Sequence, residues 1–263
     1  SDIALQTATF VGGRFIANYV RDAKSIVRVH GIDGGLVAEV PLPGLGSAAG
    51  FAGSKNSTET FFSYMDFLTP AAIMRYDVAE NAVTPFRKPT VAADFTPYET
   101  RQVFYRSKDG TRIPMFVTRA RNAPRDGAQP LLLYGYGGFD VSLTPTFRPA
   151  TQVWLEMGGT YVEANLRGGG EYGEPWHRAG TKLQKQNVFD DFIAAAEFLI
   201  AEKYTSAARL VINGRSNGGL LVGAVLTQRP ELFGAALPAV GVLDMMRDMA
   251  VQGNYAYVGT EGG

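Results

Sequence analysis

Ser216 stands at the centre of a G-x-S-x-G motif, flanked by Gly214 and Gly218. The apolar run 210–212 precedes the motif, and a run rich in Leu and Val follows it. A short strand, a sharp turn and a helix in this order are typical of a nucleophile elbow, which exposes a serine hydroxyl. The first N–H groups of such a helix lack partners and can stabilise an oxyanion. The motif therefore predicts an acyl-accepting nucleophile at Ser216; the alternative is an ordinary turn serine.

Two further glycine-rich runs each follow a predicted strand. The first, Tyr134-Gly-Tyr-Gly-Gly-Phe139, lies where hydrolases with this kind of elbow supply a second oxyanion donor, and a simple turn is the alternative. The second, Arg167-Gly-Gly-Gly-Glu-Tyr-Gly173, lacks the spacing and the acidic residue of a dinucleotide-binding loop. We expect this second run to form a tight loop packed near the site.

A serine nucleophile needs a base, and the chain has only two histidines, His30 and His177. Both precede Ser216, whereas the acid and the histidine of α/β-hydrolases follow the serine in the chain. His30 lies in a predicted strand, where a structural role is expected. The 47 residues after Ser216 contain four acidic residues, Glu231, Asp244, Asp248 and Glu261. They contain no histidine.

Alternating strands and helices are predicted to carry these motifs from about residue 130 onward. Strands are expected at 131–134, 160–165, 210–212 and 235–240, and helices at 149–157 and after 187. Asn187 is expected to cap the second of these helices. Such alternation predicts a mostly parallel sheet with its site at the carboxyl ends of the strands.

The residues before this part are predicted to be all-β. Short strands at 14–20, 25–32 and 36–42, and again at 47–53, 58–64 and 72–77, suggest two sets of about four strands each. Short strands at such regular spacing indicate a sandwich or propeller blades, and sets of this size fit blades better. A hairpin at 99–118 with an Asp-Gly turn follows, and Pro114 favours an edge position in it.

Composition excludes several classes of protein. With 46% hydrophobic residues in 263, the chain can bury a core. Lys+Arg and Asp+Glu are both 25, so no nucleic-acid or anionic-membrane partner is indicated. No apolar run approaches the ~18 residues of a membrane span. Zero cysteines exclude disulfides and thiolate metal sites. We expect a soluble protein, cytoplasmic or periplasmic, and its oligomeric state is open.

Several motifs together resemble the prolyl oligopeptidase family of serine peptidases. They are the runs 134–139 and 165–173, Trp176-His177, Gly214-Arg-Ser-Asn-Gly-Gly219, Gln228-Arg-Pro-Glu-Leu-Phe233 and Val240-Gly-Val-Leu-Asp-Met245. They span most of residues 98–247 in the family's order. The resemblance implies an α/β-hydrolase domain, here only its N-terminal portion at 98–263, preceded by C-terminal blades of a β-propeller at 1–97.

The resemblance also implies roles for individual residues. Ser216 matches the nucleophile, the backbone N–H of Asn217 matches an oxyanion donor, and the Tyr136 hydroxyl completes that hole. The pocket for the substrate's proline ring is matched by three residues: Phe139, Val242 and, where the family has a stacking tryptophan, Tyr257. No metal or organic cofactor is implied, and short proline-containing peptides are the expected partners.

The triad is incomplete in this sequence, because the resemblance places neither its Asp nor its His here, and His177 matches a family position outside it. We expect the chain to be a fragment that begins within the propeller and stops before the acid and histidine loops. The predicted function is a Ser-His-Asp peptidase cleaving after proline, with the fragment alone nearly inactive. The alternatives are a related esterase or acylaminoacyl peptidase, or a non-catalytic scaffold if the chain is complete.

Overall fold

A computed structural model describes residues 3–244 of the 263-residue chain. The chain divides into two compact units. Among the described residues, one unit contains 3–100 with 144–152, and the other contains 101–143 with 153–244. Each unit has its own hydrophobic core.

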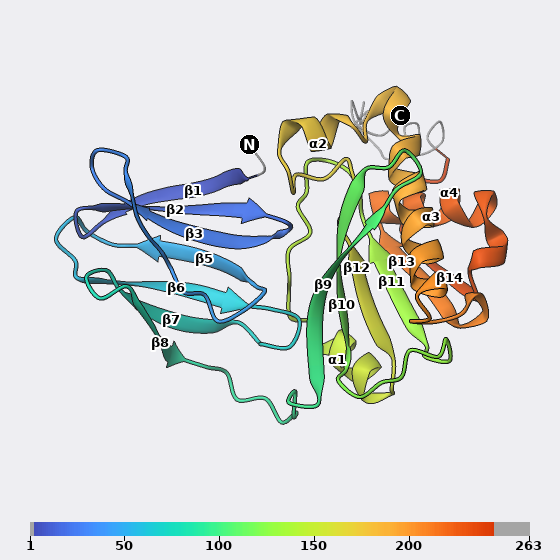
Figure 1. Ribbon diagram of the computed structural model, residues 1–263, viewed down its shortest axis with the longest axis horizontal. Helices are drawn as coiled ribbons and strands as arrows, with labels where there is room; N and C mark the ends of the chain where they lie inside the picture. Colours follow the sequence, from blue (N-terminus) through green and yellow to red (C-terminus); the bar gives the residue numbers. More distant parts are fainter. Residues whose placement is uncertain (1–2, 245–263) are drawn as a thin grey trace, which may run out of the picture. The chain divides into compact units, whose positions relative to one another are not determined.

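The first unit holds two four-stranded antiparallel sheets whose strands follow chain order (Figure 1). One sheet contains β1 (Ala4–Val11), β2 (Arg14–Arg21), β3 (Lys24–His30) and β4 (Leu36–Glu39). The other contains β5 (Ser47–Ala52), β6 (Glu59–Met65), β7 (Ala72–Asp77) and β8 (Ala82–Arg87). Two such sets of strands were predicted from the sequence, without bounds for β1 and β8.

Alternation of buried and exposed side chains explains these strands. β7 buries every second residue, so one of its faces lies on the core. The Phe51 and Phe62 rings stack there with centroids 4.5 Å apart. The segment 144–152 also packs in this unit, where Gln152 Nε2 donates to the carbonyl oxygen of Phe67 at 2.7 Å.

The second unit is built on a six-stranded sheet in the order β14-β13-β11-β12-β10-β9 (Figure 1). Its strands are β9 (Tyr98–Arg106), β10 (Arg112–Ala120), β11 (Leu131–Gly135), β12 (Thr160–Ala164), β13 (Leu210–Arg215) and β14 (Ala235–Ala239). The four strands from β11 to β14 pair in parallel, and β10 pairs antiparallel with β12. The predicted mostly parallel sheet is therefore present.

Helices connect the parallel strands. They are α1 (Pro149–Glu156), α2 (Glu174–Arg178), α3 (Gln186–Ala201) and α4 (Asn217–Gln228), with short 3-10 turns η1 (Lys182–Gln184), η2 (Ala207–Arg209) and η3 (Pro230–Leu232). Buried residues of α3 and α4, such as Phe192 and Val222, belong to the same core as Leu133 and Ile212 of the sheet. Leu133 lies between Val162 and Ile212 in the register.

Two local predictions were wrong. Asn187 does not cap α3, because the cap position is Lys185 and the Asn187 amide instead donates to the carbonyl oxygen of Ala179 at 2.9 Å. Pro114 lies on β10, which is interior to the sheet and not its edge. The proline is tolerated because the pairing of β10 with β12 begins one residue later, at Met115.

Candidate active site

Ser216 is the single residue between the end of β13 and the start of α4. Its backbone has φ 58° and ψ −117°, a strained conformation for a residue with a side chain. The main chain is held on both sides: Ser216 N–H donates to the Ala239 carbonyl at 2.9 Å, and its own carbonyl accepts from Gly219 N–H at 2.8 Å. The residue is exposed. The turn thus holds the serine backbone and presents the residue to solvent, as an elbow requires.

Close approach of the main chain explains the flanking glycines. A Cβ on Gly214 would collide with the carbonyl group of Gly218. A Cβ on Gly218 would lie 2.6 Å from the carbonyl oxygen of Gly135, at the end of β11. The G-x-S-x-G spacing is therefore a packing requirement of this strand–turn–helix unit.

The loop after β11 lies against the start of α4. Asn217 Nδ2 donates to the carbonyl oxygen of Tyr136 at 2.6 Å, and Asn217 is buried. Tyr136 and Phe139 are both half-buried, and Phe139 has a positive φ of 57°. The backbone of the predicted oxyanion tyrosine is thus bonded to the residue that follows the predicted nucleophile.

The chain after β14 approaches the same place. A Cβ on Gly219 would lie 2.5 Å from the Cα of Gly241, and the next residue, Val242, is half-buried. Tyr257 lies outside the described residues. The other predicted site residues follow the carboxyl ends of parallel strands: Tyr136 and Phe139 after β11, Ser216 and Asn217 after β13, and Val242 after β14. The parallel sheet brings these ends to one edge, where such folds place their sites.

Both histidines bind backbone groups. His177 is buried on α2, and its Nδ1 lies 2.8 Å from the carbonyl oxygen of Gly168 and 3.1 Å from the amide nitrogen of Asp140. It therefore links the loop after β11 to the loop after β12. Nδ1 of His30 lies 3.1 Å from the carbonyl oxygen of Gly34 within one hairpin. Each imidazole is thus held by main-chain groups of a nearby loop or turn.

Lys185 is a further residue of this region that was not predicted from the sequence. This lysine lies just before α3, is 9% exposed, and donates from Nζ to the Gly137 carbonyl and to Asn217 Oδ1, at 3.0 Å each. No motif marks it, because a lysine in a polar segment usually faces solvent.

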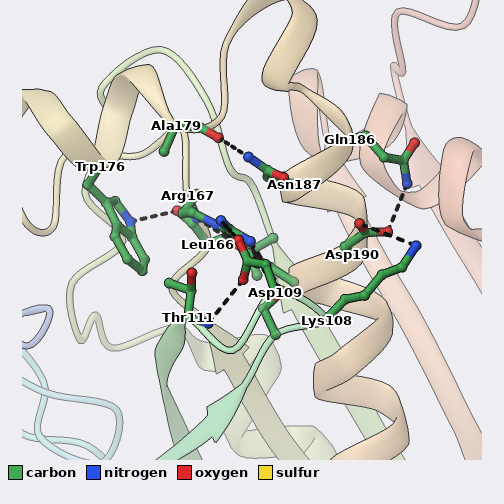
Figure 2. Close-up of polar contacts among 12 residues, drawn as sticks. Lys108, Asp109, Thr111, Leu166, Arg167, Trp176, Ala179, Gln186, Asn187 and Asp190 are labelled. Carbon is green, nitrogen blue, oxygen red and sulfur yellow. Dashed lines mark hydrogen bonds and ion pairs between the residues drawn. The ribbon is translucent and has the colours of Figure 1, made fainter.

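Arg167 is the first residue of the glycine-rich run 167–173 that follows β12, and it forms a buried polar cluster. Its guanidinium donates to both carboxylate oxygens of Asp191 on α3 and to Asp109 in the turn between β9 and β10. Ser107 Oγ also donates to Asp191, at 2.5 Å. Figure 2 shows Arg167 beside Asp109, with the Trp176 indole donating to the Leu166 carbonyl at 3.0 Å. This cluster ties three segments of the second unit together.

The two carboxyl groups of this cluster have pKa values shifted in opposite directions. Partial burial acts to raise the pKa of Asp109, but hydrogen bonds from Arg167 and Thr111 lower it to about 2. Burial raises the pKa of Asp191, and the hydrogen bonds from Arg167 and Ser107 oppose that rise. Asp109 is therefore ionised at any pH near neutrality.

Glu171 is a second buried acid, in the loop after β12. Burial raises the pKa of Glu171, and the nearby Glu163 carboxylate adds to this rise. Hydrogen bonds from Leu143 N–H and Asn165 Nδ2 oppose it, and the resulting pKa is about 7. The Leu143 amide lies 3.0 Å from Glu171 Oε1. Glu171 therefore joins the loop after β12 to the loop after β11.

Within residues 3–244, no group of three or more His, Cys, Asp or Glu side chains is placed to hold a metal ion. In the same part of the chain, no helix has both the length and the apolar character that crossing a membrane requires.

Two family models match the chain. The model of the prolyl oligopeptidase N-terminal beta-propeller domain matches residues 1–89, and that of the prolyl oligopeptidase family matches residues 145–261. The antiparallel sheets are thus propeller blades, and the mostly parallel sheet belongs to an α/β-hydrolase domain.

Curated relatives agree with these models. A prolyl endopeptidase of Elizabethkingia meningoseptica is 48% identical over 236 residues, and one of Dictyostelium discoideum is 40% identical over 238. A dual function macrocyclase-peptidase of Galerina marginata is 38% identical over 254 residues. The alignments cover 90%, 89% and 94% of this chain but 34%, 31% and 35% of those proteins. The chain thus spans about a third of the length of the relatives.

Solved structures show the same similarity. A structure from a mechanistic analysis of two prolyl endopeptidases has a TM-score of 0.88 at 48% identity, covering 94% of this chain and 36% of that one. Prolyl oligopeptidase B of Galerina marginata, bound to a 35mer hydrolysis and macrocyclization substrate, has a TM-score of 0.90 at 35% identity over 100% of this chain and 38% of that one. With both family models, these similarities establish that the chain belongs to the prolyl oligopeptidase family.

Proposed function

We propose that this chain carries the nucleophile and the oxyanion hole of a serine peptidase that cleaves short peptides after proline. The observation that supports this most directly is the exposed Ser216 at a positive φ, bonded through its neighbour Asn217 to the Tyr136 loop. An elbow serine beside a second donor loop is the arrangement that acyl transfer requires.

In the proposed reaction, Ser216 Oγ attacks the carbonyl carbon of the scissile bond while a base removes the hydroxyl proton. The oxyanion accepts hydrogen bonds from the Asn217 backbone N–H and the Tyr136 hydroxyl. The C–N bond then breaks, the amine leaves with the proton that the base returns, and water hydrolyses the acyl-enzyme. Phe139, Val242 and Tyr257 are the proposed apolar contacts of the substrate's proline ring.

The base is the part of the mechanism that this chain does not supply. No histidine follows Ser216, and His177 contacts the Gly168 carbonyl and the Asp140 amide. We therefore propose that the Asp and His of the triad lie outside these 263 residues. Without that histidine, the chain by itself is nearly silent, since loss of the base costs about 10⁶-fold in kcat in a comparable triad.

The preference for proline is proposed from the relatives, which are named prolyl endopeptidases and a macrocyclase-peptidase. The complete encoded polypeptide should be assayed on a Gly-Pro chromogenic amide and on a short aryl ester. The Ser216→Ala variant is expected to lose both activities, and Ser206→Ala, outside the elbow, should keep them.

Three results would contradict the proposal in different ways. Activity that persists in Ser216→Ala would exclude Ser216 as the nucleophile. Cleavage of the ester without the amide would indicate an acyl hydrolase without proline preference. Amide hydrolysis by the 263-residue chain alone, lost in Ser216→Ala, would show that the base lies within it.

A further inference from the structure

We propose that Lys185 is a positioning residue that holds the two oxyanion donors at a fixed separation. This inference rests on the proposed function, because it concerns the oxyanion hole of that reaction. The two donors come from segments 81 residues apart in sequence, Tyr136 after β11 and Asn217 at the start of α4. Something must hold one segment to the other.

The Lys185 ammonium bridges these segments directly. Its Nζ donates to the carbonyl oxygen of Gly137 in the first segment and to Oδ1 of Asn217 in the second, at 3.0 Å in both cases. Both contacts are buried. Hydrogen bonds from a charged donor are shorter and stronger than neutral ones, so this bridge is well suited to holding geometry.

Lys185 also determines which way the Asn217 amide faces. An ammonium group only donates hydrogen bonds, so its partner on Asn217 must be the oxygen, Oδ1. The NH₂ end then points to the Tyr136 carbonyl oxygen, 2.6 Å away. One cation therefore fixes two links between the loop and the helix: its own bond to Gly137 and the bond from Asn217 to Tyr136.

The loop after β11 packs closely against the side-chain amide of Asn217. A Cβ on Gly138 would lie 2.6 Å from Asn217 Nδ2, so the loop approaches the amide at a distance that only glycine permits. Asn217 is 3% exposed, and water has little access to replace the lost contacts. Removing the ammonium would leave the Gly137 carbonyl and Asn217 Oδ1 without this donor in a buried place.

The presence of a lysine at position 185 is not explained by a stabilising effect on α3. Lys185 is the N-cap of this 16-residue helix, where the macrodipole disfavours a cation and where Ser, Thr, Asp or Asn is preferred. A cation is therefore at the unfavourable end of its own helix. The position is explained instead by the oxygen atoms that the ammonium contacts.

Removal of the Lys185 ammonium is expected to lower the rate of catalysis. A misplacement of about 1 Å in a catalytic group can cost about 10²-fold in rate, and loss of one oxyanion donor costs about 10²–10³-fold. Lys185→Met would loosen both donors and remove neither, so the expected loss is at most about 10²-fold. Because the oxyanion exists only along the reaction path, kcat should fall while KM changes little.

The test measures kcat and KM on the Gly-Pro amide for the complete encoded polypeptide and four variants. Lys185→Met removes the ammonium, Asn217→Ala removes the side chain but keeps the backbone N–H, and the third variant combines both. Lys108→Met is the matched control, since Lys108 is 79% exposed and pairs only at 3.9 Å with Asp190 (Figure 2). Melting temperatures show which variants are folded.

Lys185→Met should lose about 10- to 100-fold in kcat with KM within about 3-fold of wild type. The double variant should lose less than the product of the two single losses, because both substitutions break the same chain of contacts. Should Lys185→Met not fold, Asn217→Ala carries the test, since it breaks that chain in the middle.

A kcat equal to wild type in a folded Lys185→Met variant would overturn the inference, and so would a wild-type kcat in Asn217→Ala. Losses in the two single variants that multiply in the double variant would also overturn it. A wild-type polypeptide that cleaves the amide, with Ser216→Ala inactive and Lys185→Met unaffected, rejects Lys185 alone. A wild-type polypeptide that cleaves neither amide nor ester rejects the proposed function itself. The two failures are therefore distinct.

Discussion

The side-chain amide of Asn217 donates to the carbonyl oxygen of Tyr136 across 2.6 Å. Asn217 is also the first residue of α4, so its own backbone N–H belongs to the four that have no partner within the helix. The side chain thus joins the two segments of the proposed oxyanion hole, while the main chain of the same residue is a free donor within α4.

Substituting Tyr136 with Phe tests the second donor. The Tyr136→Phe variant keeps the ring and loses only the hydroxyl, so we expect kcat to fall by about 10²–10³-fold with little change in KM. Thermal stability should be unchanged, because Tyr136 is half-buried and its backbone contact is kept. Steady-state kinetics measure the effect, and Tyr98→Phe, another half-buried tyrosine, is the control. A kcat equal to wild type would remove the hydroxyl from the mechanism.

Substitution of Gly214 tests whether the elbow requires the close approach of Gly214 to the backbone of Gly218. In Gly214→Ala, the new Cβ would collide with the backbone of Gly218, and backbone cannot swing aside as a side chain can. We expect a destabilisation of about 1–3 kcal/mol and loss of activity.

Gly223→Ala is the matched control for that substitution. A Cβ on Gly223 would meet only the end of the exposed Leu243 side chain, and alanine favours the interior of α4. Urea unfolding of both variants measures the difference. Equal stabilities would mean that the turn relaxes around Gly214.

Glu171 is expected to make stability depend on pH. Its pKa is about 7 in the folded protein and 4.5 ordinarily, so between these values the folded state holds a proton that the unfolded state has lost. The contribution of Glu171 to stability therefore falls as pH rises from about 4.5 to 7, by about 3 kcal/mol in total. Glu171→Gln should remove this fall.

The measurement is the free energy of unfolding in urea at pH 5 and at pH 8. The drop between the two pH values should be smaller in Glu171→Gln than in wild type by about 2.5 kcal/mol. Glu174→Gln is the control, because the side chain of Glu174 is 57% exposed and pairs with Arg178 on the surface. An unchanged drop in Glu171→Gln would show that this acid titrates normally.

Arg167 should be necessary for stability. Breaking a buried ion pair from one side leaves an uncompensated charge, and Asp191 has no exposed side-chain surface. We expect Arg167→Met to destabilise the protein by about 3–5 kcal/mol. Arg178→Met, which breaks an exposed pair with Glu174, should cost at most about 0.5 kcal/mol. Urea denaturation compares the two, and similar losses would contradict the assigned importance of the buried pair.

Much of the fold was predictable because its signals are local. The apolar run 210–212 and the glycines around Ser216 specify a strand, a turn and a helix within a dozen residues, and the structure has β13 and α4 there. The alternating pattern of β7 likewise follows from its own residues. Pro114 and Asn187 were misplaced because strand order and side-chain partners depend on segments distant in the chain.

The same distinction between local and long-range information applies to the candidate site. Sequence motifs by themselves determined the elbow serine and the glycine-rich loop, because each depends on residue types at short spacing. Only the tertiary structure decided that Lys185, Asn217 and Gly137 meet, and that Arg167 binds Asp191 and Asp109. The physical reason is that a hydrogen bond acts over about 3 Å in space, whatever the distance along the chain.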